Sequence, residues 1–285
     1  QTRSAVVNAS RGTVYDRNLN TLAISFNDST DAVYGGIYLW PRVFSTRSYE
    51  TILLKSSDVP HSAMISALRA VIGTLISIPL SMMLAFVMSR KDFVLRSAVT
   101  KIVLFTMYVS GGLIPTFILM TKLGLYNNIW AIIIPASFSI WYIILTRTYF
   151  ASIPEELREA AKIDGANNYQ CLFRVYIPNA KSILAVIAIY TLVARWNSWY
   201  DAMIYIPDQA MQPLQLYLRR ILVDQTIDLS LTLSMADMEE LELRQMSNDQ
   251  LKYAMIIFTT LPIIFAYPFL QRYFVKGVMV GSLKG

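Results

Sequence analysis

The chain has 285 residues, of which 55% are hydrophobic and 15% are charged, and its mean hydropathy is +0.44. Because soluble domains carry about 25% charged residues, this composition excludes an ordinary soluble enzyme. A single cysteine excludes a disulfide framework and a four-cysteine metal site, and a single histidine leaves little imidazole chemistry. We attribute the formal net charge of +6 to membrane topology rather than to nucleic-acid binding.

Five apolar segments are each long enough to cross a hydrocarbon core of about 30 Å as a helix. Unpaired backbone is too costly in lipid for any structure except a helix or a closed barrel, and no alternating barrel pattern is present. The sequence therefore predicts an all-α polytopic membrane protein. Its five transmembrane helices are expected at about 64–88, 102–120, 129–145, 183–206 and 253–270.

Three of these segments contain residues that are unusual in an apolar helix, because they either bend it or carry a charge. Gly111, Gly112 and Pro115 predict a bend in the second segment, because proline lacks the N–H group of the helical ladder. Arg69 lies in the opening turns of the first segment, where its long side chain is expected to reach the interface. Arg195 lies about 18 Å into the fourth segment, so it is expected to face protein or water rather than lipid.

Lysine and arginine residues predict the orientation of the segments. They are concentrated in the connections 88–101 and 146–182 and in the C-terminal tail, which alternating topology places on one side. We assign that side to the cytoplasm, because cytoplasmic loops carry the excess of basic residues. The predicted parts are an extracytoplasmic segment at 1–61, a transmembrane domain at 62–275 with a cytoplasmic loop at 152–178 and an extracytoplasmic loop at 207–251, and a cytoplasmic tail at 276–285.

The first 60 residues contain neither a signal peptide nor a spanning segment. Nothing in them explains how they would reach the outer side of a membrane. Because the sequence also opens with Gln1, we expect that an upstream helix is missing from this chain, or that residues between about 18 and 22 have been lost.

The cytoplasmic loop is the most informative stretch of the sequence. A helix is expected from about Ile153 to Asp164, with a capping box formed by Ser152 and Glu155 and a left-handed stop at Gly165. A second helix is expected at about 168–176, ending near Pro178. Small side chains on the first helix would let another protein approach closely. A plain solvent-exposed helix between two spans explains the same composition.

The spacing within this loop matches a known pattern. Glu159-Ala160-Ala161, three residues, Gly165, nine residues and then an apolar stretch ending at Pro178 resemble the EAA signature of bacterial ATP-binding-cassette (ABC) importer permeases. The stretches 110–116, 196–201 and 267–277 resemble the branch that imports complex oligosaccharides, similar to the second permease subunit of maltose-type systems. The resemblance covers about 21–285 and departs at the start, because the family normally has six helices.

The resemblance implies the architecture of a type I ABC importer permease, a multi-pass protein of the bacterial cytoplasmic (inner) membrane. Its implied partners are a second permease subunit, two ABC ATPase subunits, an extracytoplasmic solute-binding protein and the lipid bilayer. ATP and Mg would bind the ATPase subunits, because this chain has no Gly-x-x-x-x-Gly-Lys-Ser/Thr phosphate loop. No catalytic residue, metal site or bound cofactor is expected in this chain. The implied ATPase-coupling residues are Glu159, Ala160, Ala161, Ile163, Asp164, Gly165 and Pro178.

The fourth segment contains the candidate substrate surface. Three aromatic residues follow the helical spacing i, i+3 and i+4, and an asparagine and an aspartate four residues apart would share another side. Aromatic faces beside a few polar groups suit a sugar, and an arginine suits a uronate carboxylate. Helix packing, with the arginine and the aspartate satisfied internally, explains the same residues. The candidate substrate-path residues are Arg195, Trp196, Asn197, Trp199, Tyr200 and Asp201.

The leading functional prediction is the transmembrane subunit of an ATP-driven oligosaccharide importer. One alternative is an ABC permease for a non-sugar solute such as peptide or phosphate. A second is a membrane-embedded scaffold or an enzyme without ATPase partners. The predicted spans contain Arg69, Arg195 and Asp201 as their charged residues, which leaves little chemistry for an enzyme.

Overall fold

The computed structural model describes residues 25–27, 40–41, 43–55, 58–221, 252–265 and 268. The chain divides into two compact units, one of residues 1–60 with 217–262 and one of residues 61–216 with 263–285. Apart from an isolated bridge between Asn27 and Phe44 in the first unit, the regular structure of the described residues is helical. The predicted tail at 276–285, and most of the predicted segment at 1–61, lie outside the described residues.

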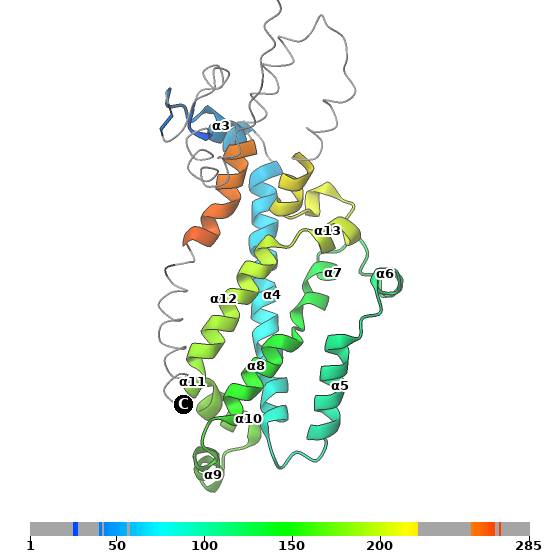
Figure 1. Cartoon of the computed structure of the whole chain (residues 1–285), viewed down its shortest axis with the longest axis vertical. Helices are drawn as coiled ribbons and strands as arrows, with labels where there is room; N and C mark the ends of the chain where they lie inside the picture. Colours follow the sequence, from blue (N-terminus) through cyan, green and yellow to red (C-terminus); the bar gives the residue numbers. More distant parts are fainter. Residues whose placement is uncertain are drawn as a thin grey trace, which may run out of the picture. The chain divides into compact units, whose positions relative to one another are not determined.

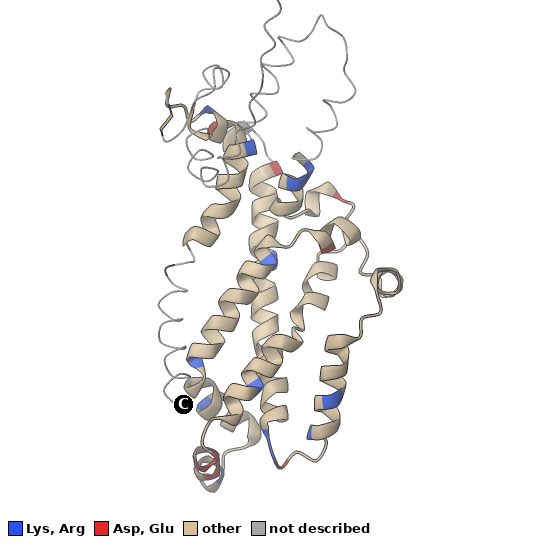
Figure 2. Ribbon diagram, in the orientation of Figure 1, with Lys and Arg blue, Asp and Glu red and all other residues tan. Residues whose placement is uncertain are grey.

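The longest helix is α4, Asp58–Ser89, with 32 residues. It is longer than the predicted span at 64–88, and at ~1.5 Å per residue it measures about 48 Å, more than a hydrocarbon core requires. From Ala70 to Ser89 it carries no charged residue. In Figure 1 the long helices of the second unit run lengthwise beside α4, and the charged residues of Figure 2 lie mainly near the helix ends.

The second predicted span is bent, as the sequence indicates. Helix α5, Arg96–Tyr108, and helix α6, Leu113–Lys122, meet at 115°. Gly112, at the N-terminus of α6, has a φ of 83°, a conformation that glycine adopts at little cost. Pro115 lies in the first turn of α6, where its missing N–H removes no helical hydrogen bond. The glycine therefore accounts for the bend, rather than the proline.

Two further predicted spans are also discontinuous. The third consists of α7 (Trp130–Ile133), a 3-10 turn η2 (Pro135–Ser137) and α8 (Ile140–Ala151). The fourth consists of α12 (Lys181–Asn197) and α13 (Tyr200–Tyr205). The sequence did not predict either break.

Length and apolar character qualify two helical segments as membrane spans, Asp58–Ser89 and Trp130–Ala151. If each of two bent pairs, residues 96–122 and 168–197, is a single span, the described residues contain up to four spans. The described part of the fifth predicted span, Lys252–Phe265, is apolar, and most of the residues that follow it lie outside the described part of the chain. The structure therefore has the mostly helical, apolar character of a membrane protein, and the total of five spans stays a prediction.

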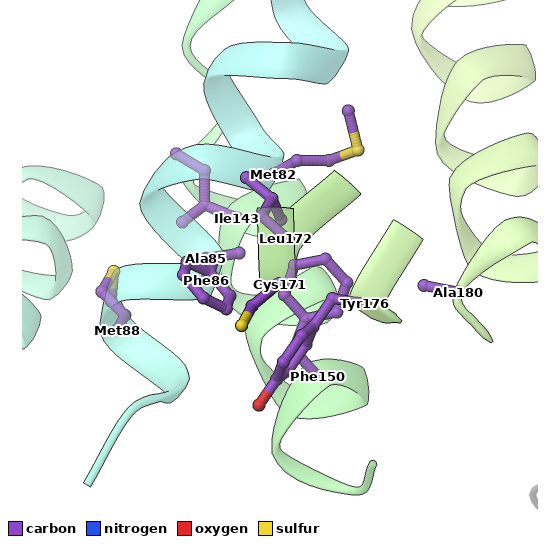
Figure 3. Close-up of a cluster of buried hydrophobic side chains, with 10 residues drawn as sticks. All are labelled: Met82, Ala85, Phe86, Met88, Ile143, Phe150, Cys171, Leu172, Tyr176 and Ala180. Carbon is purple, nitrogen blue, oxygen red and sulfur yellow. The ribbon is translucent and has the colours of Figure 1, made fainter. Parts of the chain in front are cut away.

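An apolar cluster joins the end of α4 to α8 and to the loop that follows α8 (Figure 3). Phe86 of α4 and Phe150 of α8 both meet Tyr176 edge-on, with ring centroids 4.9 and 5.3 Å away. Cys171 is fully buried in this cluster. Apolar burial therefore anchors the second half of the 152–178 loop to the helices.

We predict that Phe150→Ala lowers the melting temperature of the purified protein in detergent, because a buried phenylalanine truncated to alanine costs about 3–5 kcal/mol. Phe173→Ala is the matched control, since Phe173 is 57% exposed and Phe150 is 1% exposed. Equal melting temperatures for the two variants would contradict the packing described here.

Candidate functional site

The first helix of the 152–178 loop is α9, Glu155–Ile163. It begins two residues later than predicted, because Pro154 has an extended backbone (ψ 132°). The predicted capping box of Ser152 and Glu155 is wrong: the Ser152 hydroxyl donates to the Tyr149 carbonyl at 2.7 Å, and the Glu155 carboxylate pairs with Arg158. Gly165 ends the helix in a left-handed conformation, with a φ of 82°, which confirms the predicted stop.

The second helix of the loop begins with a capping box that the sequence analysis missed. The Asn167 side chain accepts from the Gln170 N–H, and the Gln170 side chain accepts from the Asn167 N–H, both at 2.8 Å. The pattern of an N-cap asparagine with glutamine three residues later was readable in the sequence. The helical path then runs through α10 (Asn168–Cys171), the π-helical turn η3 (Leu172–Tyr176) and α11 (Ile177–Asn179), close to the predicted range 168–176.

The residues of the EAA pattern lie on an open surface. Ile163 is 87% exposed, and Ala161 is half-buried. The other predicted coupling residues are exposed: Glu159, Ala160, Asp164, Gly165 and Pro178. Beside them is a hollow of about 260 Å³, lined by Ala161, Asp164, Gly165, Ala166, Gln170, Arg174 and Val175. The loop therefore presents small, apolar and charged groups that another molecule can reach.

A charged cluster lies beside α9, and sequence reasoning missed its central residue, Asp92, in the turn between α4 and α5. Arg90 Nε donates to Asp92 Oδ1 at 2.7 Å, and Arg158 and Lys162 of α9 lie 3.7 and 3.8 Å from the other oxygen. The hydrogen bonds from Arg90 lower the pKa of Asp92 from 3.8 to about 2. The resulting stabilisation is present above pH 3.8 and is lost as the pH falls towards 2.

Arg195 of α12 meets the break between α7 and α8. Its guanidinium donates to the carbonyls of Ile133 and Ala136, at 3.5 and 2.5 Å, and the residue is 4% exposed. Those carbonyls flank a break that interrupts the helical ladder, and such groups need partners where no water is available. Arg195 faces protein, as predicted, and these contacts match the helix-packing interpretation of this residue.

Arg69 of α4 meets the break between α12 and α13. It donates to the Ser198 carbonyl at 2.9 Å and forms an ion pair with Asp201. The Ser198 hydroxyl donates to the same carboxylate at 2.7 Å. The prediction that Arg69 reaches the interface is wrong, because its side chain is buried and paired. We call Arg69, Arg195 and Asp201 the arginine network.

The predicted aromatic face does not form. Ser198 is extended (ψ 132°), so Trp196 lies in the last turn of α12, while Trp199 is the N-cap and Tyr200 the first residue of α13. Trp196 is buried, whereas Tyr200 is 51% exposed. The Tyr200 ring meets the Trp199 ring edge-on, with ring centroids 5.6 Å apart. Residues spaced i, i+3 and i+4 share a face only in an unbroken helix. The break at Ser198 therefore separates the three aromatic side chains.

The break also separates the two polar residues that were expected to share a side. Asn197 is exposed, and its side-chain oxygen accepts from Gln215 at 3.5 Å, while Asp201 lies against Arg69. The structure therefore pairs Arg69 with Asp201, places Arg195 within electrostatic range of both, and leaves Asn197 apart from them.

Gly73 of α4 provides the space for Arg195. A Cβ atom built on Gly73 would lie 2.6 Å from Arg195 Nη1 and 2.7 Å from its Cζ, closer than real Cβ contacts. Sequence reasoning missed this residue, although a glycine inside a long apolar helix is a signal of close approach. The glycine lets the arginine of α12 lie against the backbone of α4.

Residues 77–280 match the family described as binding-protein-dependent transport system inner membrane component. The chain belongs to this family. It is 34% identical over 269 residues to the polygalacturonan/rhamnogalacturonan transport system permease protein YtcP of Bacillus subtilis, covering 94% of this chain and 91% of YtcP. It is 31% identical over 267 residues to protein LplC of the same organism, covering 94% and 88%.

A solved structure supports the same assignment. The chain is similar, with a TM-score of 0.80 and 30% identity, to a chain of a bacterial ABC transporter involved in the import of the acidic polysaccharide alginate. The alignment covers 90% of this chain and 89% of that chain. The resemblance seen in the sequence is confirmed: the chain is a permease of the binding-protein-dependent transport family and not an enzyme, its fold is that of the solved ABC transporter, and YtcP and that transporter are named for polysaccharide transport.

We predict that Gly73→Ala lowers both the melting temperature and the transport activity, because the new methyl group displaces the Arg195 guanidinium from the carbonyls that it caps. Gly111→Ala is the matched control, since its Cβ would meet its nearest neighbour, Pro115 Cβ, at an ordinary 3.9 Å. If the Gly73→Ala protein is as stable and active as the Gly111→Ala protein, the Arg195 side chain does not depend on the space beside Gly73, and the prediction is wrong.

Proposed function

We propose that this permease is one transmembrane subunit of an ATP-driven importer in the bacterial cytoplasmic membrane. It pairs with a second permease subunit, receives an oligosaccharide from an extracytoplasmic solute-binding protein, and is driven by two ATPase subunits that bind ATP and Mg. The observation that supports this proposal is the exposed EAA surface on α9 and its turn, in a chain whose family is that of ABC importer permeases.

The loop containing α9 couples ATP hydrolysis to transport in this proposal. It lies between α8 and α12, so a displacement of the loop passes directly along both helices. ATP drives import only if the closed ATPase dimer binds the outward-facing state better than the inward-facing one. The hollow beside Gly165 then receives side chains of the ATPase, with Glu159 and Asp164 available to its basic groups.

The substrate is an oligosaccharide that carries carboxylates. Two arginines accompany one aspartate in the arginine network, so positive charge exceeds negative charge where helices α7–α8 and α12–α13 are broken. Broken helices mark the binding sites of many transporters, and buried cations attract anions strongly at low dielectric. The named cargoes of YtcP and of the solved importer are polygalacturonan, rhamnogalacturonan and alginate, which agrees with this charge.

The extracytoplasmic loop at 207–251 contacts the solute-binding protein in this proposal. Its first part, including Asp208, is described, and residues 222–251 lie outside the described residues. The loop is acidic, so its contact with a basic partner surface would weaken as salt increases.

We predict that Gly165→Trp releases the ATPase subunits during purification in detergent and abolishes uptake. The large ring fills the hollow that the ATPase would occupy, and the φ of 82° adds strain. Gly124→Trp is the matched control, because Gly124 also has a positive φ (70°) and open surroundings but lies in a different turn. Retention of the ATPase by Gly165→Trp would contradict the coupling role.

We predict that the importer prefers an oligogalacturonide to its methyl ester, which has the same backbone without charge. Arg195→Met lowers the ratio of acidic to neutral uptake at least about 10-fold, roughly 1.4 kcal/mol of discrimination, whereas Arg195→Lys retains most of it. The ratio is the informative measurement, because a folding defect lowers both uptakes together. An unchanged ratio in Arg195→Met would assign the arginine to helix packing alone.

A further inference from the structure

The two helices of the 152–178 loop are attached to the bundle in different ways. The second helix buries Cys171, Leu172 and Tyr176 in the apolar cluster that contains Phe86 of α4 (Figure 3). Helix α9 buries one residue, Arg158, within the described structure. Apolar packing therefore holds the second helix, while α9 depends more on charged contacts.

Those charged contacts converge on Asp92. From its own turn Arg90 binds it through two nitrogens, and from α9 Arg158 and Lys162 approach the same oxygen at 3.7 and 3.8 Å. Arg90 also donates to the Asn168 side chain at the start of α10, at 3.0 Å. One carboxylate thus joins the turn between α4 and α5 to the loop. We call Arg90, Asp92, Arg158 and Lys162 the Asp92 cluster.

A pocket of about 420 Å³ lies beneath this cluster, between the end of α4, the following turn and the start of α10. Its walls include Phe86, Phe93, Tyr169 and Leu172, and Arg90 and Asp92 also line it. Because the space is open, continuous apolar packing does not connect the turn to the loop at this point. The charges at its edge carry the contact, and the open space permits small relative movements.

We propose that Asp92 is a positioning residue for transport, which makes the turn between α4 and α5 follow the movement of α9. When the ATPase displaces α9, Arg158 and Lys162 move with it, and the Asp92 carboxylate draws the turn in the same direction. Helices α4 and α5 are thereby driven from the loop, although neither is joined to it by the adjacent chain. This inference rests on the proposed coupling role of α9.

Electrostatics supports a network here rather than isolated surface pairs. A single exposed ion pair contributes little, but three cations share one carboxylate, and the Arg158 side chain is only 10% exposed. Arg158 Nη1 has no hydrogen-bond partner, so Asp92 at 3.7 Å contributes to balancing its charge. Glu155 pairs with Nε and Nη2, on the opposite edge of the Arg158 guanidinium, and fixes its position on α9.

The test uses the whole importer, with its partner permease, ATPase subunits and binding protein, reconstituted in liposomes. For Asp92→Asn we expect normal assembly, ATP hydrolysis within about twofold of the original rate, and uptake reduced about 5- to 10-fold. More ATP is then consumed per oligosaccharide. Asp92→Glu restores the ratio of uptake to hydrolysis, because it keeps the charge. Asp58→Asn, which removes an exposed charge at the other end of α4, leaves the ratio unchanged.

A second variant protects the test against a folding defect. Lys162→Gln weakens the same cluster from α9, and we expect a smaller loss of coupling that adds nothing when combined with Asp92→Asn. Additive losses, an unchanged ratio in Asp92→Asn, or no rescue by Asp92→Glu would each overturn the inference. If the unaltered chain neither binds the ATPase nor requires ATP for uptake, the proposed function itself fails instead.

Discussion

The architecture of the described bundle depends on how backbone N–H and C=O groups find hydrogen-bond partners at helix breaks that water does not reach. An uncapped carbonyl is costly in lipid, so a broken span persists only when another group binds the freed carbonyls. Two arginines supply those groups here. Arg195 binds the carbonyls beside the α7–α8 break, and Arg69 binds the carbonyl of Ser198 between α12 and α13. The same residues that cap the backbone also place positive charge inside the protein.

This double role explains why structural and substrate interpretations of Arg195 are both reasonable. A guanidinium has five N–H groups, so hydrogen bonds to carbonyls do not exhaust its donors, and its full charge is retained. Arg195 Nε has no protein partner. Capping therefore fixes the position of the charge, and the charge sets the electrostatic environment in which an anionic oligosaccharide would pass.

Local signals in the sequence predicted the parts of the fold that depend on neighbouring residues. The charge-free stretch of α4, the turn at Gly165 and the bend beside Gly112 all follow from composition or from the conformational freedom of glycine. The break at Ser198 was not predicted, because its stabilising partner, Arg69, lies more than 100 residues away in the chain. Asp92 was missed for the same reason, since its contacts with α9 are made by folding rather than by spacing.

The close contact between Gly73 and Arg195 has an evolutionary consequence. The arginine occupies the volume that a side chain at position 73 would need, so a substitution at position 73 acts directly on the position of Arg195. A larger residue at 73 requires the Arg195 side chain to move or to be shortened, and the Ala136 carbonyl then needs another donor, while the Ser137 hydroxyl still donates to the Ile133 carbonyl at 2.6 Å. Paired substitution at these two sites would therefore mark permeases that have reorganised the centre of the bundle.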